Sequence, residues 1–223
     1  MKKALIAALI FLGSCKSTDS IHLFAKSAGA GVNEISLQVT ESPGESVDNS
    51  RQNKQNDSIS YLFWHTLSIY FRLLQNDPDR KLLADSAGHL MILLGLVQTG
   101  TFQDKNHSEV ILSSARIMLN TILNKNTRCD RYGKLVRTMK KNESALSFLI
   151  DHCNLMLDFS HAGNFKIQTS QKMLKLVQKD HYMLIFGRPP TGFAFTPAEI
   201  SQDIVLINKM TANLRSFHPD ANE

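Results

Sequence analysis

From Ser58 onward, apolar residues recur every three or four positions, and proline or glycine residues separate one run from the next. This spacing places the apolar side chains along one face of an α-helix. The expected helices cover residues 58–74, 78–98, 108–123 and 144–163, then a segment from 169 to the turn at 187, and one from 197 towards 217. Leu90–Val97 is almost continuously apolar, which predicts a central, buried position for the second helix. The sequence thus predicts an all-α fold, a single bundle of six or seven helices over residues 58–223.

The preceding segment, residues 15–57, has a different composition. Its second half, Thr40–Asp57, contains one apolar residue, Val47. Such a stretch buries too little surface to offset the entropy lost on ordering, so we expect a flexible polar linker over 15–57. Ile35, Leu37 and Val39 alternate with polar residues, and a short strand there is the alternative. A linker of this length would let the domain stand at a distance from the membrane. The alternative is a tether whose length has no functional importance.

The first fourteen residues have the layout of an export signal. Two lysines, Lys2 and Lys3, precede the apolar run Ala4–Leu12, and small residues follow it. The run is too short to cross a bilayer, which takes about 20 apolar residues. A plain secretory signal and an uncleaved anchor are the alternatives to the interpretation that follows.

Leu12, Gly13, Ser14 and Cys15 together resemble the lipobox of bacterial lipoproteins. The resemblance covers residues 1–15 only, and the mature domain resembles no family. It implies a signal peptide over residues 1–14, diacylglycerol on the Cys15 sulfur and a further acyl chain such as palmitate. It also implies an exported protein held at a membrane by its lipid. Lys16, where aspartate favours retention in the inner membrane, favours the outer membrane or cell surface instead.

Two cysteines remain in the mature chain, Cys129 and Cys153. An exported compartment is often oxidising, so we predict a disulfide between them. Two unpaired thiols in a helical core are the alternative.

The basic character of the chain is concentrated in the helical domain. Residues 58–223 carry 19 cationic and 14 anionic side chains, and residues 125–141 carry seven cations and one anion. A cationic stripe binds anionic lipid, polysaccharide or an acidic protein surface, and a solvated helix face is the alternative. An exported protein is not expected to meet nucleic acid. The candidate residues are Arg128, Arg131, Lys134, Arg137 and Lys141.

Aromatic residues flank the turn that begins at Gly187. Phe186, Phe193 and Phe195 are a candidate interface, because aromatic side chains on a stiff loop make good anchors for a partner. Burial in the core is the alternative for all three.

Chemistry-bearing patterns are weak. His152 and Cys153 are adjacent, but no metal-ligand spacing surrounds them, and no nucleophile motif or phosphate-binding glycine loop occurs. We therefore expect no metal, no catalytic residue and no cofactor apart from the covalent lipid on Cys15. The leading hypothesis is a membrane-anchored envelope lipoprotein that binds a protein partner, as an accessory to a secretion or pilus apparatus or in surface contact. The alternatives are a helical lipoprotein that binds a small ligand or lipid and, with less support, an enzyme.

Overall fold

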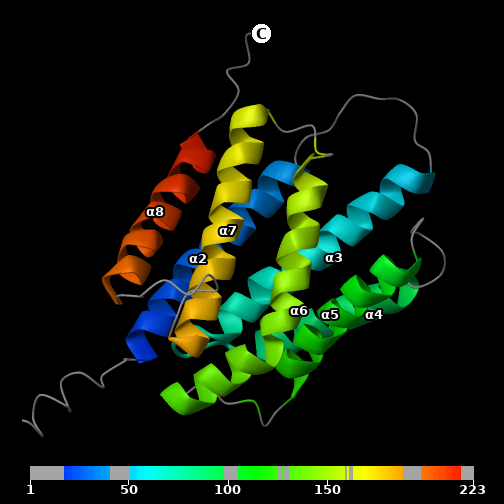
Figure 1. Ribbon diagram of the computed structural model, residues 1–223. Coiled ribbons are helices and arrows are strands. Elements are labelled where there is room, and N and C mark those ends of the chain that lie inside the picture. The colour runs from blue at the N-terminus through cyan, green and yellow to red at the C-terminus, as the bar shows by residue number, and fades with distance from the viewer. Residues whose placement is uncertain are drawn as a thin grey trace, which may run out of the picture.

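The computed structural model describes residues 18–40, 51–97, 105–124, 127, 131–158, 160, 163–187 and 197–216, and every structural statement below concerns these residues. The predicted all-α bundle is confirmed for this part of the chain: it forms seven helices and no strand (Figure 1). Their bounds are α2 (Thr18–Thr40), α3 (Arg51–Leu73), α4 (Arg80–Val97), α5 (Lys105–Leu123), α6 (Tyr132–Asp158), α7 (Asn164–Phe186) and α8 (Pro197–Ser216).

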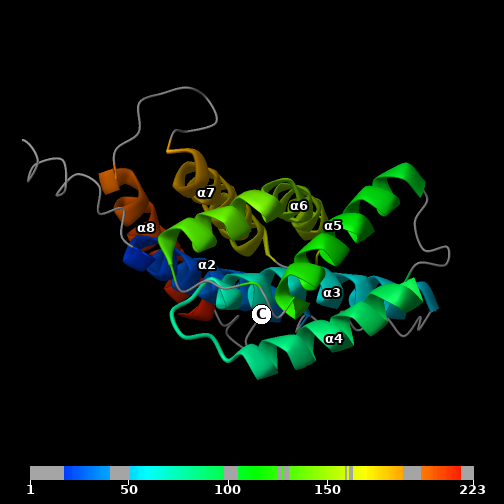
Figure 2. The ribbon, with the colours of Figure 1, turned by 90° about the horizontal axis from the view of Figure 1, so that it is seen from below.

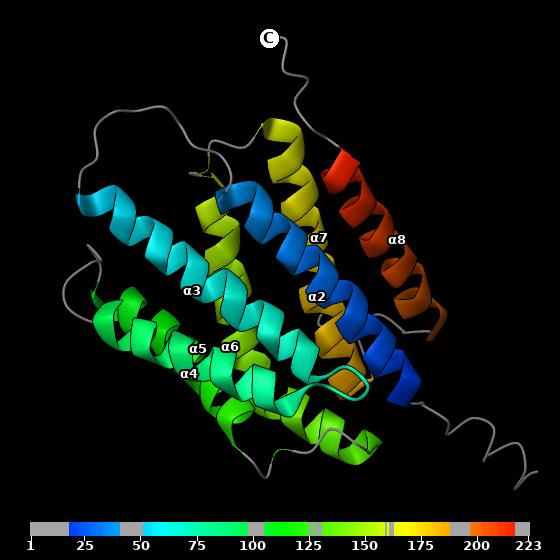
Figure 3. The same ribbon diagram turned by 180° about the vertical axis from the view of Figure 1, so that it is seen from behind.

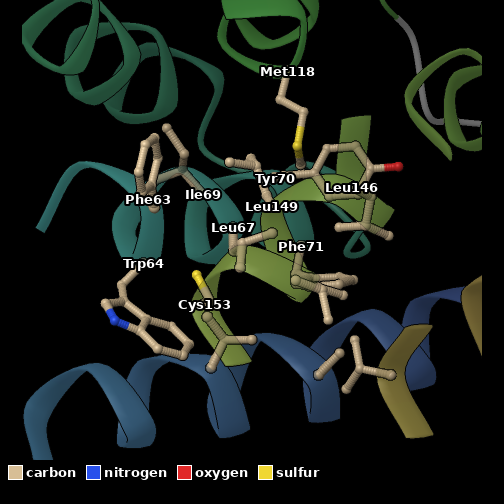
Figure 4. Packing of buried hydrophobic residues seen from close by; sticks show 14 of the residues in the cluster. Phe63, Trp64, Leu67, Ile69, Tyr70, Phe71, Met118, Leu146, Leu149 and Cys153 are labelled. Atoms are coloured by element: carbon tan, nitrogen blue, oxygen red, sulfur yellow. The ribbon is translucent and has the colours of Figure 1, made fainter. Parts of the chain in front are cut away.

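The helix at the centre of the bundle is α3. It contacts α2, α4, α5 and α6, and nearly every side chain from Leu62 to Leu74 is buried. Trp64 and Phe71 lie off its main apolar stripe, yet both are fully buried because neighbours cover α3 on several sides. Figure 4 shows Trp64 and Phe71 directed towards the ribbon of α2, and Phe63 on the other side of α3.

The central position predicted for the second helix is wrong. That helix, α4, packs against α3 and α5 at an edge of the bundle, and the side chains of Ile92 and Leu96 are 66% and 70% exposed. Its apolar stretch is therefore only partly used in the core. The central position belongs to α3, whose hydrophobic side chains are covered by other helices on several sides.

The flexible linker predicted over residues 15–57 is wrong for most of that segment. Residues 18–40 form α2, and residues 51–57 are the first turns of α3. The proposed strand at Ile35, Leu37 and Val39 is also wrong, since all three are helical. The buried face of α2 has ordinary helical spacing, with Ile21, Phe24, Ala25, Ala28, Val32 and Ile35 in the core. The bundle therefore begins at or before Thr18, and not at residue 58.

Polar contacts fix α2 at both ends. Near its start, His22 Nδ1 donates to the Leu74 carbonyl oxygen at 2.7 Å, which satisfies a carbonyl group at the end of α3. Near its end, Arg215 Nε of α8 donates to Glu34 at 2.7 Å, and Lys166 Nζ of α7 donates to Gln38 Oε1 at 2.6 Å. Figure 3 shows α2 lying between α3 and α8.

A single long helix, α6, joins the basic segment to the helix expected at residues 144–163. Asn142 lies in the interior of α6 and is fully buried. Asn142 accepts from the Thr121 hydroxyl at 3.0 Å and donates to the Thr138 carbonyl oxygen at 2.8 Å. The second of these bonds competes with the backbone ladder, and α6 changes direction part of the way along (Figures 1 and 2).

Small residues allow α2 to approach its neighbours. A Cβ atom on Gly29 would lie 3.3 Å from Phe71 Cβ, and one on Gly31 would lie 2.6 Å from Met173 Sδ. Gly31 therefore lies where Met173 of α7 and Thr211 of α8 both pack tightly against α2, since its added Cβ would also lie 3.3 Å from Thr211 Oγ1.

This contact predicts the effect of enlarging Gly31. Gly31→Leu forces Met173 and its neighbours apart and should lower the free energy of unfolding by about 1–3 kcal/mol or more. Gly95→Leu is the matched control, because Gly95 is exposed and no atom lies within 4 Å of its added Cβ. Urea denaturation measures both variants. Equal stability of the two variants would contradict the packing of α2 described above.

Candidate functional site

The basic residues singled out from the sequence lie on the first part of α6. We define the basic arm as residues 131–142, which contain five cationic side chains and no acidic one. Arg131, Arg137, Lys140 and Lys141 are exposed and Lys134 is half-buried, whereas Arg128 lies outside the described residues. At 100° per residue, the helical cations spread over about a third of the circumference. The buried side chains of the arm face away from them: Leu135, Thr138, Met139 and Asn142.

The basic arm shares a corner of the bundle with the start of α2. In all three views the amino-terminal ends of α2 and α6 lie at the same corner (Figures 1–3), together with the start of α8. Cys15, the residue expected to carry lipid, lies outside the described residues but precedes Thr18 by only three positions. The helix α2 thus brings the expected anchor close to the basic arm, which the sequence did not indicate.

Of the three aromatic candidates, only Phe186 is described. Its side chain is 38% exposed at the end of α7, and its ring stacks on Tyr182 with centroids 4.4 Å apart. Lys140 Nζ of the basic arm lies 5.9 Å from the centre of the Phe186 ring, the outer limit of a cation–π contact. Phe193 and Phe195 fall outside the described residues. Phe186 therefore belongs to the same corner as the cations.

A groove between α5 and α6 was not expected from the sequence. It has a volume of about 590 Å³ and is open to solvent. Its apolar lining comes from Val110 and Ile117 of α5 and from Phe148 of α6, which is 50% exposed. Serines 113, 114 and 144, Ala145 and Glu109 complete it. The spacing of Val110 and Ile117, seven apart and outside the core set of α5, was the signal that could have indicated it.

The start of α5 lies on the side of the bundle away from the start of α2 (Figures 1–3). Helices α5 and α6 run antiparallel, because Thr121 near the end of α5 bonds Asn142, whereas Val110 near its start faces Phe148 across the groove. The groove therefore begins on α6 two residues after the basic arm, at Ser144, and extends towards the start of α5.

A carboxylate pair, the buried Asp180 of α7 and the half-buried Asp203 of α8, lies between these two helices, and no sequence pattern indicates it. Asp180 is fully buried, and neither of its oxygen atoms accepts a hydrogen bond from the described residues. Lys179 Nζ lies 3.7 Å from Asp180 Oδ1 and donates to Asp203 of α8. Burial, with the negative charge of Asp203 as the second cause, raises the pKa of Asp180 to about 8.

A second buried polar pair joins α3 to α7. The Tyr70 hydroxyl lies 2.9 Å from His181 Nε2, and both side chains are almost completely inaccessible. Burial lowers the pKa of His181 to about 3, so the ring is neutral at pH 7 and Nε2 can accept the tyrosine proton. This pair stabilises the interior and offers no surface to a substrate.

The predicted disulfide is not tested directly, because Cys129 lies outside the described residues. Cys153 is a free, fully buried thiol beside Trp64 and Leu67 (Figure 4), and burial raises its pKa.

Within the described ranges, no three histidine, cysteine, aspartate or glutamate side chains lie together as a metal site. His152 and Cys153, which are adjacent in sequence, face different surroundings: the His152 ring packs edge-on against Phe63, with centroids 5.1 Å apart. None of the described helices has the length and apolar character needed to cross a membrane.

The raised pKa of Asp180 predicts how stability varies with pH. The folded state holds a proton on Asp180 that the unfolded state loses above about pH 4, so the contribution of Asp180 to the free energy of unfolding falls as pH rises from about 4 to 8. Asp180→Asn removes this penalty and should be about 1–3 kcal/mol more stable than the native chain at pH 8, with little gain at pH 4.

Urea denaturation at the two pH values measures this difference. His181 destabilises both proteins equally as pH falls below about 6.5, because its folded pKa lies below its unfolded value. Asp85→Asn, a change at an exposed position of α4, is the control and should leave the pH dependence unaltered. The same pH dependence of the free energy of unfolding in Asp180→Asn and in the native chain would refute the raised pKa of Asp180.

Comparison of the chain with models of known protein families, with curated proteins and with solved structures found no match.

Proposed function

We propose that the chain is a lipid-anchored protein of the bacterial envelope whose helical bundle binds a protein partner. The lipobox-like sequence ending at Cys15 supports the anchor. The exposed apolar surface around the α5–α6 groove supports the partner and is the observation that carries the proposal. Monomeric proteins expose single apolar side chains freely, but a hollow with several of them is typical of a binding surface.

The groove fits the apolar face of a helix better than it fits a small ligand. It runs between two antiparallel helices, where a third helix packs naturally. Val110 and Ile117 are two turns apart along α5, and so are Phe148 and Leu155 along α6, so each helix offers a repeat that matches a helical partner. The alternative of a small-ligand or lipid carrier calls for an enclosed apolar cavity, whereas this groove is open and includes serines and Glu109.

The distance between groove and anchor supports an assembly duty. A lipid near the start of α2 would hold that corner of the bundle at the membrane, while α5, which lines one side of the groove, begins on the opposite side of the bundle (Figure 2). The groove then stays accessible to a partner in the envelope, such as a component of a secretion or pilus apparatus. The proposal assigns no catalytic step to the chain.

Site-specific photocrosslinking in the native envelope tests the proposal. A photoreactive side chain at Phe148 should form an adduct with a protein partner, and one at Gln202, an exposed position on α8, should not. Adding Val110→Asp and Ile117→Asp should abolish the adduct from position 148, because two charges desolvate poorly in an apolar contact.

Circular dichroism of the doubly substituted chain controls for folding. Adducts of equal yield from positions 148 and 202, or none from 148, would contradict the proposed binding surface. An adduct with a lipid or small metabolite at position 148 would favour the ligand-carrier alternative instead.

A further inference from the structure

We infer that the basic arm, residues 131–142, faces the membrane and binds the anionic headgroups of its phospholipids. The inference rests on the lipid anchor of the proposed function and adds the orientation of the bundle on the bilayer. Three observations carry it: the charge of the arm, its position beside the anchor, and the aromatic side chains that border it.

The charge of the basic arm is of one sign. Arg131, Lys134, Arg137, Lys140 and Lys141 are its ionised side chains, with no acidic residue among them. Leu135 and Met139 are buried in the core beneath, so the arm cannot turn its cations inward. A cationic side chain near an anionic bilayer contributes about a fivefold gain in partitioning, and the effect falls off within a Debye length.

The position of the arm places these charges where a bilayer would be. Cys15 lies three residues before Thr18, so its Cα is at most about 11 Å from the Cα of Thr18. The start of α2 lies at the corner that contains the start of α6 (Figures 1–3). A lipid on Cys15 that inserts in a bilayer therefore brings the basic arm to the headgroups. A protein partner would instead have to fit between the arm and the bilayer.

The corner also has acidic and aromatic side chains. Asp19 and Glu199 lie in the first turns of α2 and α8, where they complement the positive ends of those helices. Phe186 is partly exposed beside Lys140. An aromatic ring next to a lysine suits the boundary between headgroups and acyl chains, where aromatic residues are enriched.

The basic arm adds orientation to this attachment. The diacylglycerol and further acyl chain expected on Cys15 already make membrane binding durable, because two or more chains suffice. Acyl chains alone leave the bundle free to rotate, whereas the basic arm selects one orientation.

Vesicle binding of the full chain with Cys15→Ser tests the inference, because this form has no lipid to anchor it. We expect it to bind vesicles of about one third phosphatidylglycerol in phosphatidylcholine, and not vesicles of phosphatidylcholine alone. Binding should be lost at about 0.5 M salt. Reversing three charges, with Arg131→Glu, Arg137→Glu and Lys141→Glu, should weaken binding by about 100-fold or more.

The matched control reverses three exposed cations on other helices, Arg116→Glu, Lys172→Glu and Lys209→Glu. It makes the same change in net charge, so it should weaken binding far less if the arm is the contact. Thermal unfolding shows whether both variants remain folded. Equal binding to the two kinds of vesicle, or equal loss in the two variants, would overturn the inference.

Metabolic labelling of the native chain with a clickable fatty acid separates this result from the proposed function. Absence of label at Cys15 would refute the lipid anchor, whatever the vesicles show. Labelled Cys15 without selective binding to anionic vesicles would leave the anchor intact and refute the basic arm as a membrane surface.

Discussion

The packing of α2 against α3 is the constraint on which the rest of the structure depends. The stretch of α3 from Leu62 to Leu74 is buried on nearly every side and needs neighbours around most of its circumference, and α2 covers the side that holds Phe71. The Phe24 and Phe71 rings meet edge to face with centroids 5.9 Å apart, and Gly29 lets the two backbones come close. Without α2, the large side chains of α3 would face water.

The contact between α2 and α3 also determines how far the bundle can move from the expected lipid anchor. A flexible linker would let the bundle move freely at a distance from the membrane. A packed α2 leaves only two residues, Lys16 and Ser17, between Cys15 and the start of α2. The proposed lipid anchor would then hold the bundle against the bilayer at one corner, with the basic arm beside it.

The fold class follows from the sequence because the helical spacing from Ser58 onward is regular. The role of α2 does not, because Gly29, Gly31 and several serines weaken its apolar pattern, and those small residues acquire meaning only beside Phe71 and Met173. The polar stretch after Thr40 further masks the helix when the whole segment is averaged. The prediction for Leu90–Val97 fails in the opposite direction. The run is strongly hydrophobic and predicts a central helix, yet α4 lies at an edge of the bundle.

The candidate sites, like the fold, can be predicted only in part from the sequence. The cations of α6 can be found from the sequence because like charges accumulate there, but their proximity to Thr18 depends on how separate helices pack. Asp180 looks like an ordinary surface acid in the sequence, and only the approach of Asp203 from α8 and its burial raise its pKa to about 8. The α5–α6 groove likewise requires two helices to be placed side by side.

Hydrogen–deuterium exchange of the full chain is the most direct test of the packed α2. Amide protection over residues 21–36 should approach that of the α3 core around Leu67, because both helices open only when the bundle unfolds. Exchange of residues 21–36 at the rate of an unstructured chain, with α3 still protected, would contradict the account and restore a flexible linker between anchor and bundle.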